Sequence, residues 1–258
     1  MARKIVITSG KGGVGKTTVC ANLAISLANK SQRVIAVDLD IGLNNLDVVL
    51  KLDHRIVFDL VDVLENRCRI KQALLQYDNL PTLFVMPSCH QNRRIITDEN
   101  VKRLLSKLDT MCDYVLIDCP AGMESGFRRS VGCANESIVV TTPHLSALRD
   151  ADKVVQYLSC AQLSEIYVVV NRLRGDLVSS GEMLSAFEVF SLLGKKPLGV
   201  IPEDDDVNCF SFATKQNSSP FEILADNLHY GTNKMFDCTS KYQGFWGRIL
   251  AKIKRRVS

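Results

Sequence analysis

One segment near the start of the chain has the residue types and the spacing of a phosphate-binding loop. It reads Gly10-Lys11-Gly12-Gly13-Val14-Gly15-Lys16-Thr17 and is followed by Thr18. Glycines let the backbone approach phosphate oxygens, so the N–H groups of the loop and of a following helix can bind an anion. Lys16 is expected to reach the β- and γ-phosphates, and the Thr17 hydroxyl to ligate Mg²⁺. The segment predicts a nucleotide site, and the alternative is a tight glycine turn without a ligand.

Acidic residues follow two apolar runs of strand length. Asp38-Leu39-Asp40 follows the run 34–37, and Asp118 follows the run 114–117. Ligands bind at the carboxyl ends of strands in open α/β sheets, so both motifs are expected beside the glycine loop. A hydrophobic strand closed by an acid is the Walker B pattern, and Asp118 is therefore expected to hold Mg²⁺ through water. An acid at a strand end can also serve only to form a turn.

The elements that must position these groups are indicated by apolar periodicity. Residues 3–8 predict a buried strand, and the pattern from Thr17 onward is helical, which is the context that a phosphate loop requires. Further strands are predicted at 34–37, 83–86, 114–117, 137–141, 166–170 and 198–201, and helices at 58–64, 100–108, 148–158 and 183–193. This alternation predicts an α/β fold of the P-loop NTPase type. Its sheet is expected to be doubly wound and mostly parallel, with helices on both faces.

Composition is that of one soluble globular domain. The 258 residues are 46% hydrophobic and 23% charged, and no apolar run approaches the roughly 20 residues of a membrane span. The N-terminus leads directly into the first predicted strand, which leaves no room for a signal peptide. The nine cysteines include no Cys-x-x-Cys pair and are expected to be mainly reduced core thiols. A cytoplasmic protein is expected.

The second lysine of the glycine loop, Lys11, identifies a resemblance. Its position is typical of the deviant Walker A (ParA/MinD) family of P-loop ATPases, which the chain resembles over most of residues 2–204. The resemblance implies an ATP hydrolase that forms a homodimer in the ATP state. Lys11 of one subunit would then reach the phosphates held by the other. It also implies catalytic roles for Lys11, Lys16 and Asp40.

The same resemblance assigns further residues to the nucleotide. Asp40 would position the attacking water, while Asp38 would stay near the phosphates and the metal. In Cys119-Pro120-Ala121-Gly122, the Gly122 N–H would be available to the γ-phosphate. The loops that hold adenine in the family correspond to Asn171, Arg172, Pro202, Glu203 and Asp204. A guanine-selective Asn-Lys-x-Asp sequence is absent, which favours ATP over GTP.

Four segments indicate the branch of the family that places the division septum. They are residues 40–47, 120–126, 146–152 and 199–204, and the first lacks the Pro-Gln that usually continues this motif in partition ATPases. This branch implies two partners, a MinC-like division inhibitor and a MinE-like activator, the latter expected near residues 146–153. Asn44 stands where the family usually has arginine, so contacts there are expected to differ.

The C-terminal segment 241–258 is predicted to be a membrane-targeting tail attached to an ATPase domain of residues 1–240. It carries six basic residues and no acidic residue. Because the net charge of the whole chain is +4, residues 1–240 carry a net charge of −2. At helical spacing, one face gathers Phe245, Trp246, Ile249, Leu250 and Ile253. A basic amphipathic helix of this kind is suited to an anionic membrane surface, and the alternative is a terminal helix docked on the domain. The only segment that resembles a linker is 238–243.

The expected location is cytoplasmic, peripheral on the inner face of the cell membrane, or on the stromal side of the inner envelope in a plastid. Two other functions stay open. A partition-type ATPase would bind DNA nonspecifically as an ATP dimer, but it requires a basic patch, and the near-neutral domain predicts no specific nucleic-acid partner. A scaffold protein would bind nucleotide without turning it over.

Overall fold

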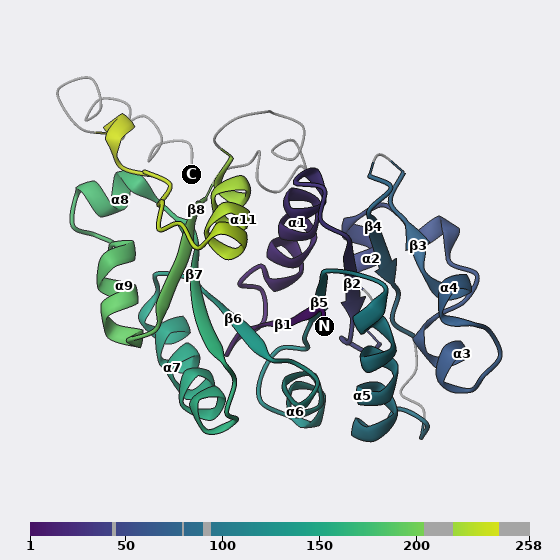
Figure 1. Ribbon diagram of the computed structural model, residues 1–258. Coiled ribbons are helices and arrows are strands. Elements are labelled where there is room, and N and C mark those ends of the chain that lie inside the picture. Colours follow the sequence, from purple (N-terminus) through teal and green to yellow (C-terminus); the bar gives the residue numbers. More distant parts are fainter. Residues whose placement is uncertain (43–44, 79, 90–93, 204–218, 243–258) are drawn as a thin grey trace.

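The centre of the molecule is one eight-stranded sheet. A computed structural model describes residues 1–42, 45–78, 80–89, 94–203 and 219–242 and shows the sheet with helices on both faces (Figure 1). The strand order is β3-β4-β2-β5-β1-β6-β7-β8, and every neighbouring pair is parallel except β3 with β4. The strands are β1 Arg3–Thr8, β2 Val34–Asp38, β3 Leu75–Gln76, β4 Leu83–Met86, β5 Tyr114–Asp118, β6 Glu136–Thr141, β7 Glu165–Leu173 and β8 Lys196–Pro202. The predicted doubly wound, mostly parallel fold is confirmed.

The helices form a layer on each face of the sheet. They are α1 Lys16–Asn29, α2 Leu46–Val49, α3 Leu60–Leu64, α4 Ile70–Ala73, α5 Asp98–Lys107, α6 Ser125–Gly132, α7 Leu145–Cys160, α8 Gly175–Ser179, α9 Ala186–Leu193 and α11 Pro220–Tyr230, with short 3-10 helices η1 Asp53–Arg55, η2 Leu108–Thr110 and η4 Ser240–Tyr242. Helices α1, α2 and α11 contribute to the core on one face, and α3, α5, α6, α7 and α9 to the core on the other (Figure 1).

The central strands are buried on both sides, which explains their nearly continuous apolar sequences. In β1, Ile5 and Ile7 belong to the core beneath α1, while Val6 between them belongs to the opposite core. Each fully buried side chain of this size stabilises the fold by about 1.5–3 kcal/mol relative to exposure. Helix α1 is itself buried almost all round, because it packs between the sheet, α2 and α11. Helix α1, which follows the glycine loop, is therefore firmly packed in the core.

Two helices begin later than the sequence predicts. Helix α3 begins at Leu60 because the Asp59 carboxylate accepts hydrogen bonds from the Val61 and Asp62 N–H groups and caps it. The Ser185 side chain caps α9 in the same way, so this helix begins at Ala186. The predicted strands and long helices otherwise lie where the periodicity placed them.

The predicted linker 238–243 packs against the domain over residues 238–242, which are the part that the structure describes. The prediction that this segment is a linker was wrong. Cys238 and Tyr242 are buried, and a Cβ at Gly175 would overlap the Cys238 carbonyl. The segment therefore packs closely on α8. The boundary at 240/241 and the tail itself stay predictions, because residues 243–258 lie outside the described residues.

The described residues bear on two predictions, the state of the cysteines and the presence of a membrane span. Their cysteines are all free thiols, and most are buried: Cys20, Cys89, Cys112, Cys119, Cys133 and Cys238. This confirms the prediction of core thiols for this part of the chain. Across the same ranges, no helix has the length and apolar character needed to cross a membrane.

Candidate functional site

The glycine loop connects β1 to α1, as predicted. Gly13 and Gly15 have φ values of 77° and 95°, in the left-handed region that glycine adopts without strain. Gly15 is the N-cap of α1, and its carbonyl accepts the Val19 N–H at 2.9 Å. The Ser9 hydroxyl donates to the Lys11 carbonyl at 2.7 Å and ties the start of the loop. The result is a tight loop at a helix N-terminus, which is a suitable geometry for phosphate.

Lys16 begins α1 and Asp118 ends β5 beside β1, so both lie next to this loop. Their exposed fractions are 8% and 1%, and both Asp118 carboxylate oxygens lack a hydrogen-bond partner among the described residues. Burial raises the pKa of Asp118, while the nearby Thr17 hydroxyl and the charge of Lys16 oppose that rise. A buried carboxylate without partners is unfavourable unless a cation or its water ligands satisfy it. Together with Thr17 at the first turn of α1, Asp118 fits the predicted Mg²⁺ site.

Asp38 lies beside Asp118 at the carboxyl edge of the sheet. The two are paired in register on β2 and β5. The Asp38 carboxylate accepts hydrogen bonds from the Asp40 N–H at 2.8 Å and the Leu46 N–H at 3.2 Å. Burial raises the pKa of Asp38, and the neighbouring Asp118 raises it further. Asp38 therefore holds the backbone of the loop after β2 in addition to adding negative charge to the site.

Asp40 is half-buried on the same side of the sheet. Burial raises the pKa of its carboxyl group, and the positive charge of Lys16 lowers it. Its N–H is bonded to Asp38, which is paired in register with Asp118, and its position at the nucleotide and its catalytic role stay predictions.

The segment after β5 also contacts the glycine loop. Gly122 has a φ of 84°, and a Cβ at Gly12 would lie 3.9 Å from the Ala121 side chain. Gly126, near the start of α6, packs so closely on Pro120 that a Cβ there would lie 2.7 Å from the proline ring. The segment before α6 therefore packs closely on that helix, and Ala121 lies near the phosphate loop.

The predicted adenine loops converge at the ends of β7 and β8. Asn171 is 4% exposed and donates from Nδ2 to the Val14 carbonyl at 2.7 Å. Arg172 is exposed and has a φ of 58°, which is unusual for a residue with a side chain. Pro202 ends β8, and the Glu203 N–H donates to the Leu173 carbonyl at 3.1 Å. Asp204 lies outside the described residues.

Two contacts of the glycine loop were missed by sequence reasoning. One is the bond between Asn171 and Val14, and the other is the packing of Gly10 on α7, where a Cβ would overlap the Asp150 backbone. Gly10 was interpreted only as part of a phosphate motif, and no sequence signal indicated its neighbour. Lys11 is exposed on the loop, whereas the predicted membrane-binding residues and Asn44 lie outside the described residues.

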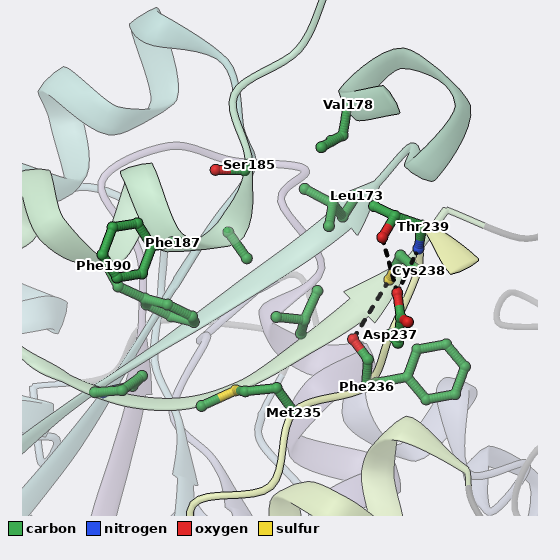
Figure 2. Close-up of a pocket in the computed structure, with 13 residues that line it drawn as sticks. Leu173, Val178, Ser185, Phe187, Phe190, Met235, Phe236, Asp237, Cys238 and Thr239 are labelled. Carbon is green, nitrogen blue, oxygen red and sulfur yellow. Dashed lines mark hydrogen bonds between the residues drawn. The ribbon is translucent and has the colours of Figure 1, made fainter. Parts of the chain in front are cut away.

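A cavity of about 440 Å³ lies elsewhere, between α9 and the segment before η4 (Figure 2). Its walls are mainly apolar, with Phe187, Phe190 and Met235 among them. The Asp237 carboxylate is used within its own turn, where it accepts the Thr239 and Ser240 N–H groups at 2.8 and 3.1 Å. None of the predicted nucleotide residues lines this cavity. The polar groups suited to phosphate chemistry are at the glycine loop.

Comparisons with known proteins show which proteins the chain is similar to. A family model described as an AAA domain matches residues 2–167. The chain is similar to the septum site-determining protein MinD of Bacillus subtilis, with 45% identity over 212 residues, 80% of this chain and 78% of that protein. It resembles MinD in the MinC:MinD cell division complex of Aquifex aeolicus, with a TM-score of 0.82, 34% identity and coverage of 90% and 97% of the two chains. It also resembles MinD complexed with Mg-ADP from Pyrococcus horikoshii, with a TM-score of 0.78, 30% identity and coverage of 89% and 96%.

Proposed function

Because this chain belongs to the MinD family within the deviant Walker A P-loop ATPases, we propose that it is an ATP-driven switch that regulates division-septum placement. In this proposal the monomer binds ATP with Mg²⁺, and two copies close into a dimer. The dimer attaches to a membrane and recruits a MinC-like inhibitor, and hydrolysis reverses both steps. The observation that carries the proposal is that Asp38 and Asp118 end neighbouring strands beside β1, from which the glycine loop leads to Lys16 at the start of α1.

Binding begins with the phosphates. The backbone N–H groups of the loop and the Lys16 ammonium would contact phosphate oxygens, and Thr17 and Asp118 would hold Mg²⁺, the latter through water. When bound, Mg²⁺ supplies neutralisation of the charge on the phosphates. The unpartnered Asp118 carboxylate supports this assignment, and so does the P. horikoshii relative described with Mg-ADP.

Hydrolysis to ADP and phosphate would depend on Asp40. Phosphoryl transfer passes through a loose transition state, so an enzyme acts mostly by positioning groups and stabilising charge. Asp40 would orient the attacking water, and its backbone is already held by the Asp38 carboxylate. Asp38 is thus proposed to keep Asp40 and the phosphate loop in register.

Dimer formation would use the exposed part of the loop. Lys11, Gly12 and Gly13 are exposed, so Lys11 is free to approach a second subunit. A lysine from the partner would neutralise phosphate charge only when ATP is present. This explains how nucleotide binding could be converted into dimerisation.

The partner surface is proposed to include the exposed side of α7. Leu145, Ser146, Arg149 and Lys153 are exposed there, and Lys153 pairs with Asp150 at 3.2 Å. The MinC:MinD complex of A. aeolicus supports a MinC-like partner. A MinE-like activator is proposed to bind near residues 146–153, where it could act on the adjacent phosphate loop through Gly10.

Membrane attachment is proposed to use the tail. Its apolar residues are Phe245, Trp246, Ile249, Leu250 and Ile253, beside six positive charges. One short amphipathic helix binds weakly, and a dimer with two tails binds more strongly through effective concentration. The protein would therefore be cytoplasmic as a monomer and peripheral on the inner face of the membrane as an ATP dimer.

Light scattering of the full chain tests the switch. The expected result is a dimer with Mg-ATP and a monomer with Mg-ADP, while Lys11→Ala stays monomeric with either nucleotide. An identical mass with both nucleotides would contradict the proposal. Salt-sensitive retention of DNA by the ATP form would instead favour a partition function. A chain that never hydrolyses ATP, even with lipid and partner present, would be a scaffold.

A further inference from the structure

A buried hydrogen bond joins β7 to the phosphate loop and supports an inference that rests on the proposed ATP site. We propose that Asn171 is a positioning residue of the phosphate loop. Its side-chain amide fixes the Val14–Gly15 peptide and thereby sets the affinity for the phosphate chain, whatever contact the base makes.

Both ends of the Asn171 amide are engaged with backbone groups. Nδ2 donates to the Val14 carbonyl at 2.7 Å, and Oδ1 accepts the Arg172 N–H at 2.9 Å. These two partners fix the orientation of the amide, because a carbonyl only accepts and an N–H only donates. Asn171 is 4% exposed and Val14 5%, so water cannot readily replace the bond between them. The contact joins parts of the chain 157 residues apart.

The bond determines where a neighbouring donor points. In a trans peptide, the C=O and N–H groups point in opposite directions. Holding the Val14 carbonyl toward Asn171 therefore directs the Gly15 N–H away from Asn171. Gly15 has a φ of 95°, and a Cβ there would overlap the Asn171 amide nitrogen. Glycine at this position allows the asparagine to approach the loop backbone.

The backbone of β7 is irregular at the same place. The pairing of β7 with β8 shifts register between Val170 and Leu173, and Arg172 between them has a φ of 58°. A non-glycine residue in this region is unfavourable and persists where surrounding contacts over-determine it. Bulges of this kind redirect a side chain. Here the irregular backbone includes Asn171, whose side-chain amide is directed at the phosphate loop.

Loss of the amide should weaken binding of the phosphates themselves. In Asn171→Ala the Val14 carbonyl loses its donor in a buried site, and the Val14–Gly15 peptide is free to rotate. The loss of such a bond to a buried group predicts an affinity about 10- to 100-fold lower. Because the effect acts through the loop, the decrease should be similar for ATP and for tripolyphosphate, which has no base.

Titration calorimetry with Mg-ATP and with Mg-tripolyphosphate tests this on the full chain. The matched control is Asn227→Ala, which removes another buried asparagine whose Nδ2 donates to the Leu198 and Lys234 carbonyls at 2.7 and 2.6 Å. This control should lower the melting temperature and leave both affinities unchanged. A parallel decrease for both ligands in Asn171→Ala, beyond that of the control, supports the inference. A decrease for ATP alone, or for neither ligand, overturns it.

If Asn171→Ala does not fold, Asn171→Ser keeps a polar group in the site while shortening its reach to the Val14 carbonyl. The same criterion applies to it, namely an equal decrease for both ligands. Failure of the parent chain to bind tripolyphosphate would count against the phosphate-loop assignment as a whole. That result is distinguishable from a variant that binds both ligands as the parent does.

Discussion

Replacing Gly10 with alanine would place a methyl group where the phosphate loop touches α7. The new Cβ would overlap the Asp150 backbone and lie 2.7 Å from the Asp150 Cβ, about 0.7 Å closer than the 3.4 Å at which ordinary contact begins. The overlapped atoms are main-chain atoms of a helix, so no side-chain rotation removes the clash. Either the loop or α7 must therefore move by about 1 Å, and overpacking of this kind costs roughly 1–3 kcal/mol of stability.

The functional effect of Gly10→Ala should exceed its effect on stability. A displacement of about 1 Å in a group that positions substrate can reduce turnover about 100-fold. The assay is ATP hydrolysis by the purified full chain, with nucleotide affinity and melting temperature measured in parallel. We expect turnover to fall by that factor while the variant remains folded at 25 °C.

Gly132→Ala is the matched control. Gly132 is the last residue of α6, and a Cβ there meets nothing within 4 Å. Alanine at a compatible helical position stabilises by about 0.4–1 kcal/mol, so this variant should hydrolyse ATP normally and melt slightly higher. If Gly10→Ala retained parental turnover and affinity, the close packing of the phosphate loop on α7 would be refuted.

Three further variants separate the steps of the proposed cycle. Lys16→Ala should abolish ATP-dependent dimerisation, because the β- and γ-phosphates lose their charge partner, and a dimer surviving in light scattering would contradict the site assignment. Asp40→Ala should bind ATP and remain dimeric while hydrolysis is lost, so parental turnover would show that Asp40 has another role. Combined Trp246→Asp and Ile249→Asp should abolish liposome binding with ATP and leave the dimer intact, since apolar contact is replaced by repulsion from anionic lipid. Joint loss of the fold and of ATP binding would instead indicate that the tail is part of the core.

The sequence predicted the elements that depend on local pattern. β1, the glycine loop and α1 follow from a continuous apolar run, closely spaced glycines and a helical periodicity, and all three were predicted in their observed order. β3 was missed because Leu75 and Gln76 are too few to show an alternation, and this strand exists only through its pairing with β4. The α3 and α9 starts were displaced because the capping side chains Asp59 and Ser185 outweigh the apolar pattern.

Contacts between distant segments could not be predicted from one sequence. The Asn171 motif was assigned to adenine through family resemblance, whereas its bond to Val14 depends on how β7 ends, with β6 between it and β1. The segment 238–243 was interpreted as a linker because it lies between the last predicted helix of the domain and the tail, but Gly175 provides a surface without a side chain on which Cys238 packs. In both cases the decisive feature is the space left by a glycine elsewhere in the fold.

The central claim is that ATP, and not ADP, brings the chain to a membrane. Sedimentation with liposomes that contain anionic lipid measures this directly for the full chain in Mg-ATP and in Mg-ADP. The account predicts that the protein pellets with liposomes in Mg-ATP, that most remains in the supernatant in Mg-ADP, and that the difference disappears in Lys16→Ala. Equal pelleting in the two nucleotides, or none in either, would contradict it.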